Sequence, residues 1–204
     1  ESAKPNSPPQ GPALLASRLR EYGANPSILD LNAYRIPTEE ENNKKFRLLN
    51  FQEAEELLIK YLSKYGDQDV IAFSGMITTL RWQEKMASIC KKHQPQTFLL
   101  SGGGLATQLK AALFQWINEL DAVAHSEGDD IILVIGKQLI EKKKNNKNLN
   151  NSTNPYYIGN INGKDRYVYA GDRPKNLERL PFAAWDLLET DINGVKVLEN
   201  YITT

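Results

Sequence analysis

Short apolar runs alternate along the chain with longer stretches in which apolar residues recur at helical spacing. The apolar runs, which predict strands, are residues 27–31, 70–74, 97–101 and 121–125. The helical stretches are residues 12–22, 51–65, 79–93, 106–117 and 128–144. Strands that alternate with helices of about 10–15 residues indicate right-handed βαβ units and a parallel sheet. The pattern therefore predicts an α/β fold with a flavodoxin-like, doubly wound sheet.

The chain reaches its first helix before any strand. Residues 1–11 are rich in Pro, Ser and Asn, which indicates a loop. In a flavodoxin-like sheet of order 2-1-3-4-5 the first strand is central. We therefore expect an apolar strand of about five residues to lie before Glu1 in the natural protein. Without it, the sheet is rearranged or another segment fills the gap, and residues 156–161 and 167–169 are the remaining strand candidates.

The rest of the chain has a different character. The run KKKNNKNLNNSTN, which ends at Asn154, predicts a polar linker. Residues 156–169 predict a hairpin that turns at Asn162-Gly163. Residues 177–188 form an apolar docking segment, and residues 195–204 are a possible strand. We therefore expect an α/β domain over residues 1–144, a linker over 145–155, and a hairpin with a connector over 156–204.

Composition narrows the classes of partner. The 204 residues include 25 Lys and Arg against 25 Asp and Glu, so no net charge attracts nucleic acid or a membrane surface. No apolar run is long enough to span a bilayer, and the first residues lack a signal-peptide pattern. The single cysteine, Cys90, excludes an internal disulfide and fits a reducing cytoplasm.

Three of the predicted strands end in small, polar loops that contain glycine. These loops are Ser74 to Thr79, Ser101 to Gly104 and His125 to Asp129. In an open parallel sheet such loops share one edge, where ligands bind. Glycine allows a ligand to approach the backbone, whose N–H groups offer hydrogen bonds. The sequence therefore predicts a ligand site at this edge.

The order of these pieces resembles the N-terminal cobalamin-binding domain of cobalamin-dependent radical S-adenosylmethionine (SAM) enzymes. The segments that carry the resemblance are PPQG before a Leu/Ala-rich helix, LREYG, ILDLN, FSGM, LSGG, DAVAHSEGD, DRP and LPFAAWD. Ser126 stands where the family's glycine–glutamate–glycine turn has its first glycine. The resemblance implies cobalamin as the cofactor and the radical SAM barrel of the same protein as the partner. It also implies a parent enzyme that is a methyltransferase or a related enzyme.

Two departures from that family change what this chain is expected to do. It lacks the Asp-x-His-x-x-Gly motif that supplies a histidine to cobalt in many cobalamin domains, so the resemblance implies cobalamin held without a protein imidazole. It also lacks the CxxxCxxC motif of the radical domain. An iron–sulfur cluster and S-adenosylmethionine therefore belong only to that other domain, and we expect no catalytic residue and no metal ligand here.

The resemblance and the loops together give the candidate cofactor-binding residues, each with a structural alternative. Asn6, Ser7, Pro8 and Gly11 would lie over the lower face of the corrin, or form a disordered tail. Ser74, Gly75, Met76, Thr78 and Thr79 would bind corrin side chains or the nucleotide tail, or cap a helix. Ser101, Gly102, Gly103 and Gly104 would approach the tail or another phosphate-bearing ligand, or make a tight turn. His125, Glu127 and Gly128 would approach the ligand, or serve packing and the dipole of the last helix.

Other conspicuous residues have plainer interpretations. Trp82 and Trp116 sit in helical patterns and are expected in the core, and Cys90 is expected to be inert. Trp185, with Phe182, would dock on the missing barrel. The alternatives to a cobalamin domain are a flavodoxin-like or receiver-like module for binding or signalling, and a vestigial scaffold without a cofactor. A receiver needs a phosphorylatable Asp where this chain has Ser74-Gly75, which argues against that class.

Overall fold

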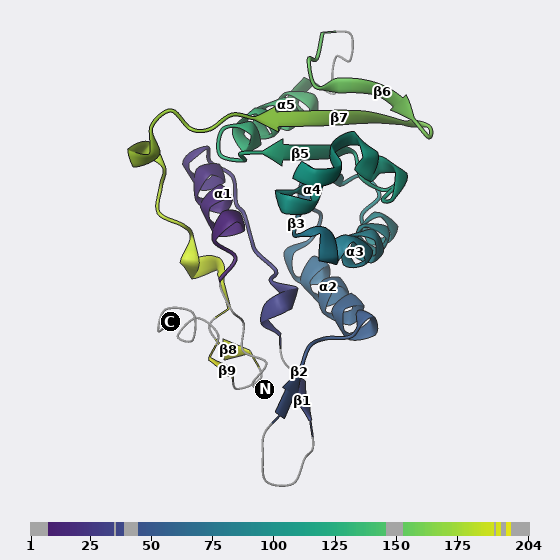
Figure 1. The fold of residues 1–204 in the computed structure, drawn as a ribbon, viewed down its shortest axis with the longest axis vertical. Coiled ribbons are helices and arrows are strands. Elements are labelled where there is room, and N and C mark those ends of the chain that lie inside the picture. The colour runs from purple at the N-terminus through teal and green to yellow at the C-terminus, as the bar shows by residue number, and fades with distance from the viewer. Residues whose placement is uncertain are drawn as a thin grey trace.

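The computed structural model describes residues 8–34, 36–38, 45–145, 153–189, 191–192 and 195–196. Its centre is a five-stranded sheet in the order β3-β4-β5-β7-β6 (Figure 1). The strands are β3 (Val70–Ser74), β4 (Phe98–Gly102), β5 (Ala122–Ser126), β6 (Tyr157–Ile161) and β7 (Lys164–Gly171). All pairings are parallel except the one between β6 and β7. The predicted α/β class with a mostly parallel sheet is therefore confirmed.

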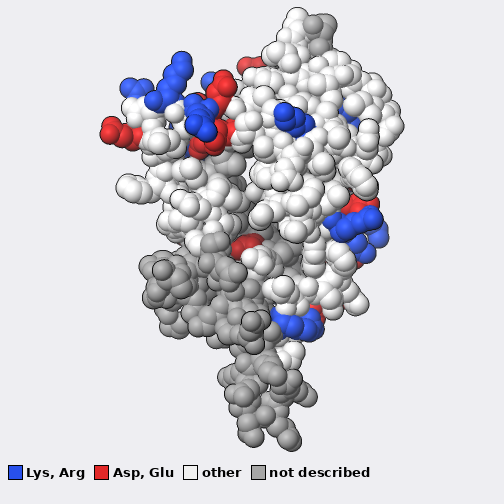
Figure 2. Space-filling view, in the orientation of Figure 1, with Lys and Arg blue, Asp and Glu red and all other residues white. Residues whose placement is uncertain are grey.

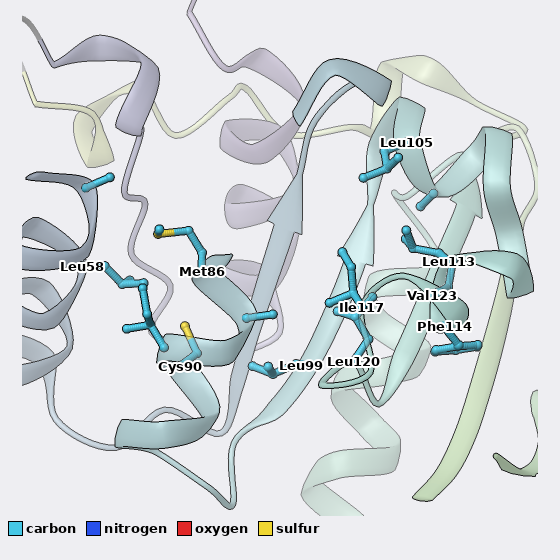
Figure 3. Packing of buried hydrophobic residues seen from close by; sticks show 14 of the residues in the cluster. Leu58, Met86, Cys90, Leu99, Leu105, Leu113, Phe114, Ile117, Leu120 and Val123 are labelled. Carbon is cyan, nitrogen blue, oxygen red and sulfur yellow. The ribbon is translucent and has the colours of Figure 1, made fainter. Parts of the chain in front are cut away.

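Helices cover both faces of the sheet. The α-helices are α1 (Gln10–Glu21), α2 (Phe51–Tyr65), α3 (Leu80–His93), α4 (Gly103–Leu109) and α5 (Ile131–Asn145). On one face α2, α3 and α4 pack against Leu99 and Val123, as Figure 3 shows. On the other face α1 and α5 pack against Leu100 and Tyr169. Alternate residues of β4 thus enter opposite cores, as the doubly wound prediction requires.

Shorter elements complete the described chain. They are η1 (Leu31–Ala33), β1 (Ile36–Thr38), β2 (Lys45–Arg47), η2 (Ile77–Thr79), η3 (Lys110–Gln115), η4 (Leu177–Arg179), η5 (Trp185–Leu187), β8 (Asp191–Ile192) and β9 (Val195–Lys196). The possible strand over residues 195–204 is observed only as β9, and residues 197–204 lie outside the described residues.

Three predicted boundaries differ from the structure. Residues 27–31 do not form a strand, because the Asp30 side chain accepts a hydrogen bond from the Asn32 amide and starts η1. The helix predicted over 106–117 begins earlier, at Gly103, and changes to η3 at Lys110, whose φ is +48°. The last helix begins at Ile131, not near Gly128.

The predicted hairpin forms as β6 and β7, and its turn is at Asn162-Gly163. Both turn residues have positive φ, +55° and +77°, which a two-residue type I′ turn requires. β7 also pairs in parallel with β5. The hairpin is therefore an edge of the main sheet, whereas the sequence grouped it with the connector. It extends the sheet beyond β5 and does not fill a position next to β3.

The segment that follows β7 returns along α1. The Ser17 hydroxyl donates to the Phe182 carbonyl, and Arg20 forms two hydrogen bonds with the Asp186 carboxylate at 2.9 and 2.7 Å. These contacts fix the apolar segment over residues 177–188 against the domain. The Phe182 side chain nevertheless remains 98% exposed. The connector is thus bound through these polar groups and through the buried side chains of Ala184 and Leu188, and it presents the Phe182 ring outward.

Arg166, on β7, is fully buried. Its guanidinium donates to the carbonyl of Leu120, to the carbonyl of Asn118 at 2.9 Å and to the side-chain oxygen of Asn118 at 2.9 Å. It also lies 5.2 Å from the centre of the Phe114 ring. Burial lowers the pKa of Arg166. This side chain ties the hairpin to the turn that leads into β5.

Replacing Arg166 with methionine leaves these buried carbonyl groups without donors. We expect Arg166→Met to lower the free energy of unfolding by about 3 kcal/mol, measured by urea denaturation. Arg81→Met is the matched control, because Arg81 is an exposed residue paired with Glu84; its cost should be below about 1 kcal/mol. Equal effects of the two substitutions would contradict the assigned role of Arg166.

The start of α2 is held by a capping box. The Asn50 side chain accepts from the Glu53 amide at 2.9 Å, and the Glu53 carboxylate accepts from the Asn50 amide at 2.8 Å. Arg47 donates to the same carboxylate at 2.7 Å. The hydrogen bonds from Arg47 and Asn50 lower the pKa of Glu53 to about 2.

Because this pKa is depressed in the folded state, ionised Glu53 stabilises the protein above its ordinary pKa of 4.5. That contribution is lost as the pH falls from there toward about 2. We expect Glu53→Gln to lower the thermal midpoint at about pH 7, and the difference from wild type to shrink near about pH 2. Glu56→Gln, on the exposed side of α2, is the control. A pH-independent difference for Glu53→Gln would disprove this assignment.

Candidate functional site

The loops that follow β3, β4 and β5 meet at one edge of the sheet. The Leu105 amide, in α4, donates to the Gly75 carbonyl at 2.8 Å, which joins the first two loops. The Ser126 amide donates to the Thr107 hydroxyl at 3.2 Å, which joins the third loop to α4. The parallel register thus brings together three segments that are distant in the sequence. α4 is the common contact of all three.

Glycine is required where the first two loops touch. Gly103 has φ +76°, and a Cβ atom there would lie 2.9 Å from the Ser74 hydroxyl oxygen and 3.2 Å from the Gly75 nitrogen. A Cβ atom at Gly75 would lie 2.3 Å from the Thr79 hydroxyl oxygen. A side chain at Gly103 would therefore prevent the close approach of the two loops, whereas one at Gly75 would disrupt the turn that Thr79 stabilises.

Two hydroxyl groups proposed as ligand contacts stabilise the protein itself. The Ser101 side chain is 0% exposed, and its hydroxyl donates to the Gln83 side chain at 2.8 Å. The Thr79 hydroxyl donates to the Met76 carbonyl at 2.7 Å and accepts from Gln83 at 3.3 Å. Ser101 is therefore wrongly assigned to the binding surface, because the strand pleat turns its side chain toward α3. The Thr79 hydroxyl stabilises the turn after β3, and it makes no side-chain capping hydrogen bond to α3, so the capping alternative is not observed for Thr79.

The sequence interpretation did not single out Gln83. It is a buried amide on the apolar face of α3, beside Met86 and Ala87. A polar residue at an inward position of an amphipathic helix is the signal that could have revealed it. Gln83 connects β4 to the turn after β3 and so sets the spacing of the first two loops.

The remaining residues of the first two loops form an open surface. Ser74, Met76, Thr78, Gly103 and Gly104 are all exposed, and the Met76 side chain is 69% exposed. Ile77, which was not predicted, is also exposed. Gly102 is half-buried between the carbonyls of Phe73 and Ala124. Hydroxyl groups, a thioether and bare backbone are thus presented side by side.

The third loop has a mixed character. His125 is half-buried, and its Nδ1 lies 3.0 Å from the Ser126 hydroxyl oxygen. Burial and then the charge of Lys110 lower the pKa of His125. Ser126 has φ +67° and is held by Thr107, a contact that the sequence interpretation missed. The His125 ring is thus oriented by Ser126, and its pKa lies below its ordinary value.

Glu127 and Gly128 do not open the last helix as predicted, because α5 begins three residues after Gly128, at Ile131. Glu127 is exposed. A Cβ atom at Gly128 would lie 3.0 Å from a methyl carbon of Leu15, so this glycine faces α1. Gly128 therefore permits close packing against α1, in agreement with its structural alternative, and its proposed ligand contact stays a prediction.

The first loop is described only in part. Asn6 and Ser7 lie outside the described residues. The Pro8 carbonyl accepts from the Gln10 amide at 2.8 Å. Gly11 lies in the first turn of α1, not in a loop, and a Cβ atom there would meet nothing within 4 Å. Its placement in the predicted loop is therefore wrong.

Of the two tryptophans predicted to lie in the core, only Trp82 packs against it. The Trp82 ring lies tilted against the Phe51 ring, with 4.3 Å between the ring centres, and packs against the core. Trp116 is 52% exposed, so its predicted core position is wrong. It borders an open depression, also lined by Phe51 and Lys85. That depression includes Asn118 and Glu119, which precede β5, so it lies away from the three loops.

Charged side chains are absent from the first two loops, whereas the third loop carries the exposed Glu127 and is followed by Asp129 and the exposed Asp130. Residues 74–79 and 101–109 contain no charged side chain. Figure 2 shows an uncharged surface over α4, whereas charged side chains gather beside it over the connector. Within the described residues no group of three His, Cys, Asp or Glu side chains could hold a metal ion. Burial raises the pKa of the Cys90 thiol to about 12, which keeps it protonated.

The comparisons add little to this geometry. No family model and no curated protein matches the chain. Among solved structures it is similar to the N-terminal domain of the hypothetical protein TM0182 from Thermotoga maritima, with 14% identity and a TM-score of 0.38. That match covers 78% of this chain and 88% of the other. A similarity this weak carries no argument about function. Among the described helices, none is long and apolar enough to cross a membrane.

The adjacent glycines of the second loop should respond oppositely to alanine. Gly103→Ala forces a positive φ and a close contact, and should lower the free energy of unfolding by about 1–3 kcal/mol. A Cβ atom at Gly104 has its nearest neighbour at 3.6 Å, and Gly104 is helical. Gly104→Ala should therefore stabilise the protein by up to about 1 kcal/mol. Urea denaturation of both variants measures this, and equal destabilisation would refute the loop geometry.

Proposed function

We propose that this chain binds cobalamin across the edge formed by the loops after β3, β4 and β5, and positions it for a radical SAM domain of the same protein. The observation that supports this most is the contact of the three loops, which leaves exposed backbone at Gly103 and Gly104. The carboxyl edge of a doubly wound sheet is where such folds bind ligands.

The chemistry of the exposed residues fits that cofactor. A corrin carries neutral amide side chains around a large, flat ring, and its nucleotide tail carries one phosphate. Ser74 and Thr78 offer hydroxyl groups to amides, and Met76 and Ile77 offer apolar surface to the ring. Gly103 and Gly104 leave the backbone open to the tail. The uncharged surface of the first two loops suits a ligand whose polar groups are mostly neutral.

The proposal keeps cobalamin without a histidine ligand from this chain. His93 lies at the end of α3, at the opposite edge of the sheet from the loops. His125 is half-buried and lies against Ser126. His125 would therefore border the ligand, as an oriented neighbour and not as a cobalt ligand.

In this proposal the chain itself carries out no bond-breaking step. Cobalamin supplies the methyl-transfer chemistry of the parent methyltransferase, and the residues named here bind and orient the cofactor. The iron–sulfur cluster and S-adenosylmethionine belong to the radical SAM domain. Phe182, held against α1 and fully exposed, is the part of the connector suited to contact that domain. A cytoplasmic location remains part of this proposal.

A visible-absorbance titration of the intact protein with hydroxocobalamin, followed by desalting, tests the proposal. We expect retained cobalamin with a perturbed spectrum. Gly104→Leu places a bulky side chain over the loops and should weaken binding at least about tenfold. Ser63→Leu adds the same bulk to an exposed position on α2 and should change affinity less than about twofold.

Two results would overturn the proposal. Failure of the intact protein to retain cobalamin would favour a scaffold that binds no cofactor, since a fold does not by itself imply a ligand. Equal weakening by Gly104→Leu and Ser63→Leu would move the site away from the glycine loops.

A further inference from the structure

Lys110 lies where α4 ends and η3 begins, and its backbone is in the left-handed region. Its φ is +48°, a conformation that costs energy for any residue with a side chain. The residue is exposed, and it forms no ion pair within the part of the chain that the structure describes. Strained backbone of this kind gathers at ligand sites, where the surrounding structure holds it in place. The fold thus fixes the backbone that carries this cation and leaves its charge available to a ligand.

α4 brings Lys110 to the third loop. The Thr107 hydroxyl of this helix accepts from the Ser126 amide at 3.2 Å, and Lys110 follows three residues later on the same side. Burial, and then the positive charge of Lys110, lower the pKa of His125, which is the residue before Ser126. The hydrogen bond and the charge effect agree in placing the ammonium group beside the end of β5.

Two hydroxyl groups accompany this cation. The exposed Thr107 hydroxyl already accepts from the Ser126 amide, and no described group accepts its proton, which is therefore available to a ligand. The Ser126 hydroxyl is exposed and lies 3.0 Å from the His125 Nδ1 atom. Ser126 also has a positive φ, +67°. One cation and two hydroxyl groups thus gather on a surface formed by α4 and the third loop.

The acidic residues of the third loop and the start of α5 do not neutralise Lys110. Asp130 pairs with Arg18 at 3.0 Å, and Asp129 is buried. Glu127 is exposed, but among the described residues no ion pair joins it to Lys110. An anionic ligand can therefore pair with Lys110 without displacing a salt bridge of the folded chain.

We propose that Lys110 and the hydroxyl groups of Thr107 and Ser126 bind a phosphate group. A phosphate offers several strong acceptor oxygens, which suit an ammonium group together with hydroxyl donors. In the proposed function, on which this choice of ligand rests, the group is the phosphate in the nucleotide tail of cobalamin. Lys110 then distinguishes cobalamin from a corrin that lacks the tail. Free inorganic phosphate is the other source of the same chemistry.

A comparison of cobalamin with cobinamide tests the assignment. Cobinamide has the same corrin ring but lacks the nucleotide tail and its phosphate. In visible-absorbance titrations of the intact protein, we expect Lys110→Met to weaken hydroxocobalamin binding about tenfold or more and to change cobinamide binding less than about twofold. Lys60→Met, at an exposed position of α2, is the matched control and should change neither affinity by more than about twofold.

The two corrins separate this inference from the proposed function. Equal weakening of both by Lys110→Met would overturn the inference, because the lysine would then act on the ring or on the fold and not on a phosphate. Retention of neither corrin by the wild-type protein would instead contradict the proposed function, and inorganic phosphate would then decide whether the phosphate site exists.

A titration with inorganic phosphate tests the site without the corrin. We expect the backbone amide NMR signals of Ser126 and Lys110 to shift and to approach saturation at about 10 mM phosphate. Lys110→Met should abolish the saturable shift, and sodium chloride at the same ionic strength should not produce it. A saturable shift with unchanged cobalamin affinity in Lys110→Met would support the site and assign free phosphate as its ligand. Absence of the shift, together with no selective loss of cobalamin, would overturn the proposal.

Discussion

The backbone ladder between β4 and its two neighbours is the constraint on which the rest of the structure depends. Its parallel register fixes Ser74 opposite Gly102 and places Val123 beside Ser101. Three loops that are far apart in the sequence therefore end at one edge. α4 can then contact all of them, since its Leu105 amide and Thr107 hydroxyl bind the first and third loops. No side-chain contact at the edge could form without that register.

Much of this framework could be predicted from the sequence. The apolar runs at β3, β4 and β5 are bounded by polar loops, and the Asn162-Gly163 turn specifies its hairpin locally. The strand predicted over residues 27–31 is wrong, because a short apolar run forms a strand only where it can pair with a neighbouring strand. The left-handed backbone at Lys110 also escaped, since nothing in the surrounding run of Ala and Leu residues announces the break.

The candidate site was harder to predict than the fold. A strand buried on both faces gives no alternation of polar and apolar residues, so the sequence could not show which way Ser101 points. The same hydroxyl-rich loop thus divides into two roles. The hydroxyl groups of Ser101 and Thr79 form hydrogen bonds with the Gln83 side chain inside the protein. Ser74 and Thr78 are exposed instead. That division depends on a buried amide contributed by α3, a contact between segments that no local pattern encodes.

The hairpin also has a consequence for the order in which the sheet assembles. Pairing of β6 with β7 spans only a two-residue turn, so it can form within about 1–10 microseconds. Pairing of β7 with β5 must instead close a loop that contains α5 and the chain that follows it. The entropy lost in closing this loop slows the pairing. The hairpin can therefore form first and dock as a unit. Arg166 can reach the carbonyls of Asn118 and Leu120 only after the hairpin has docked on β5. Its hydrogen bonds therefore form late in folding and hold the docked hairpin in place.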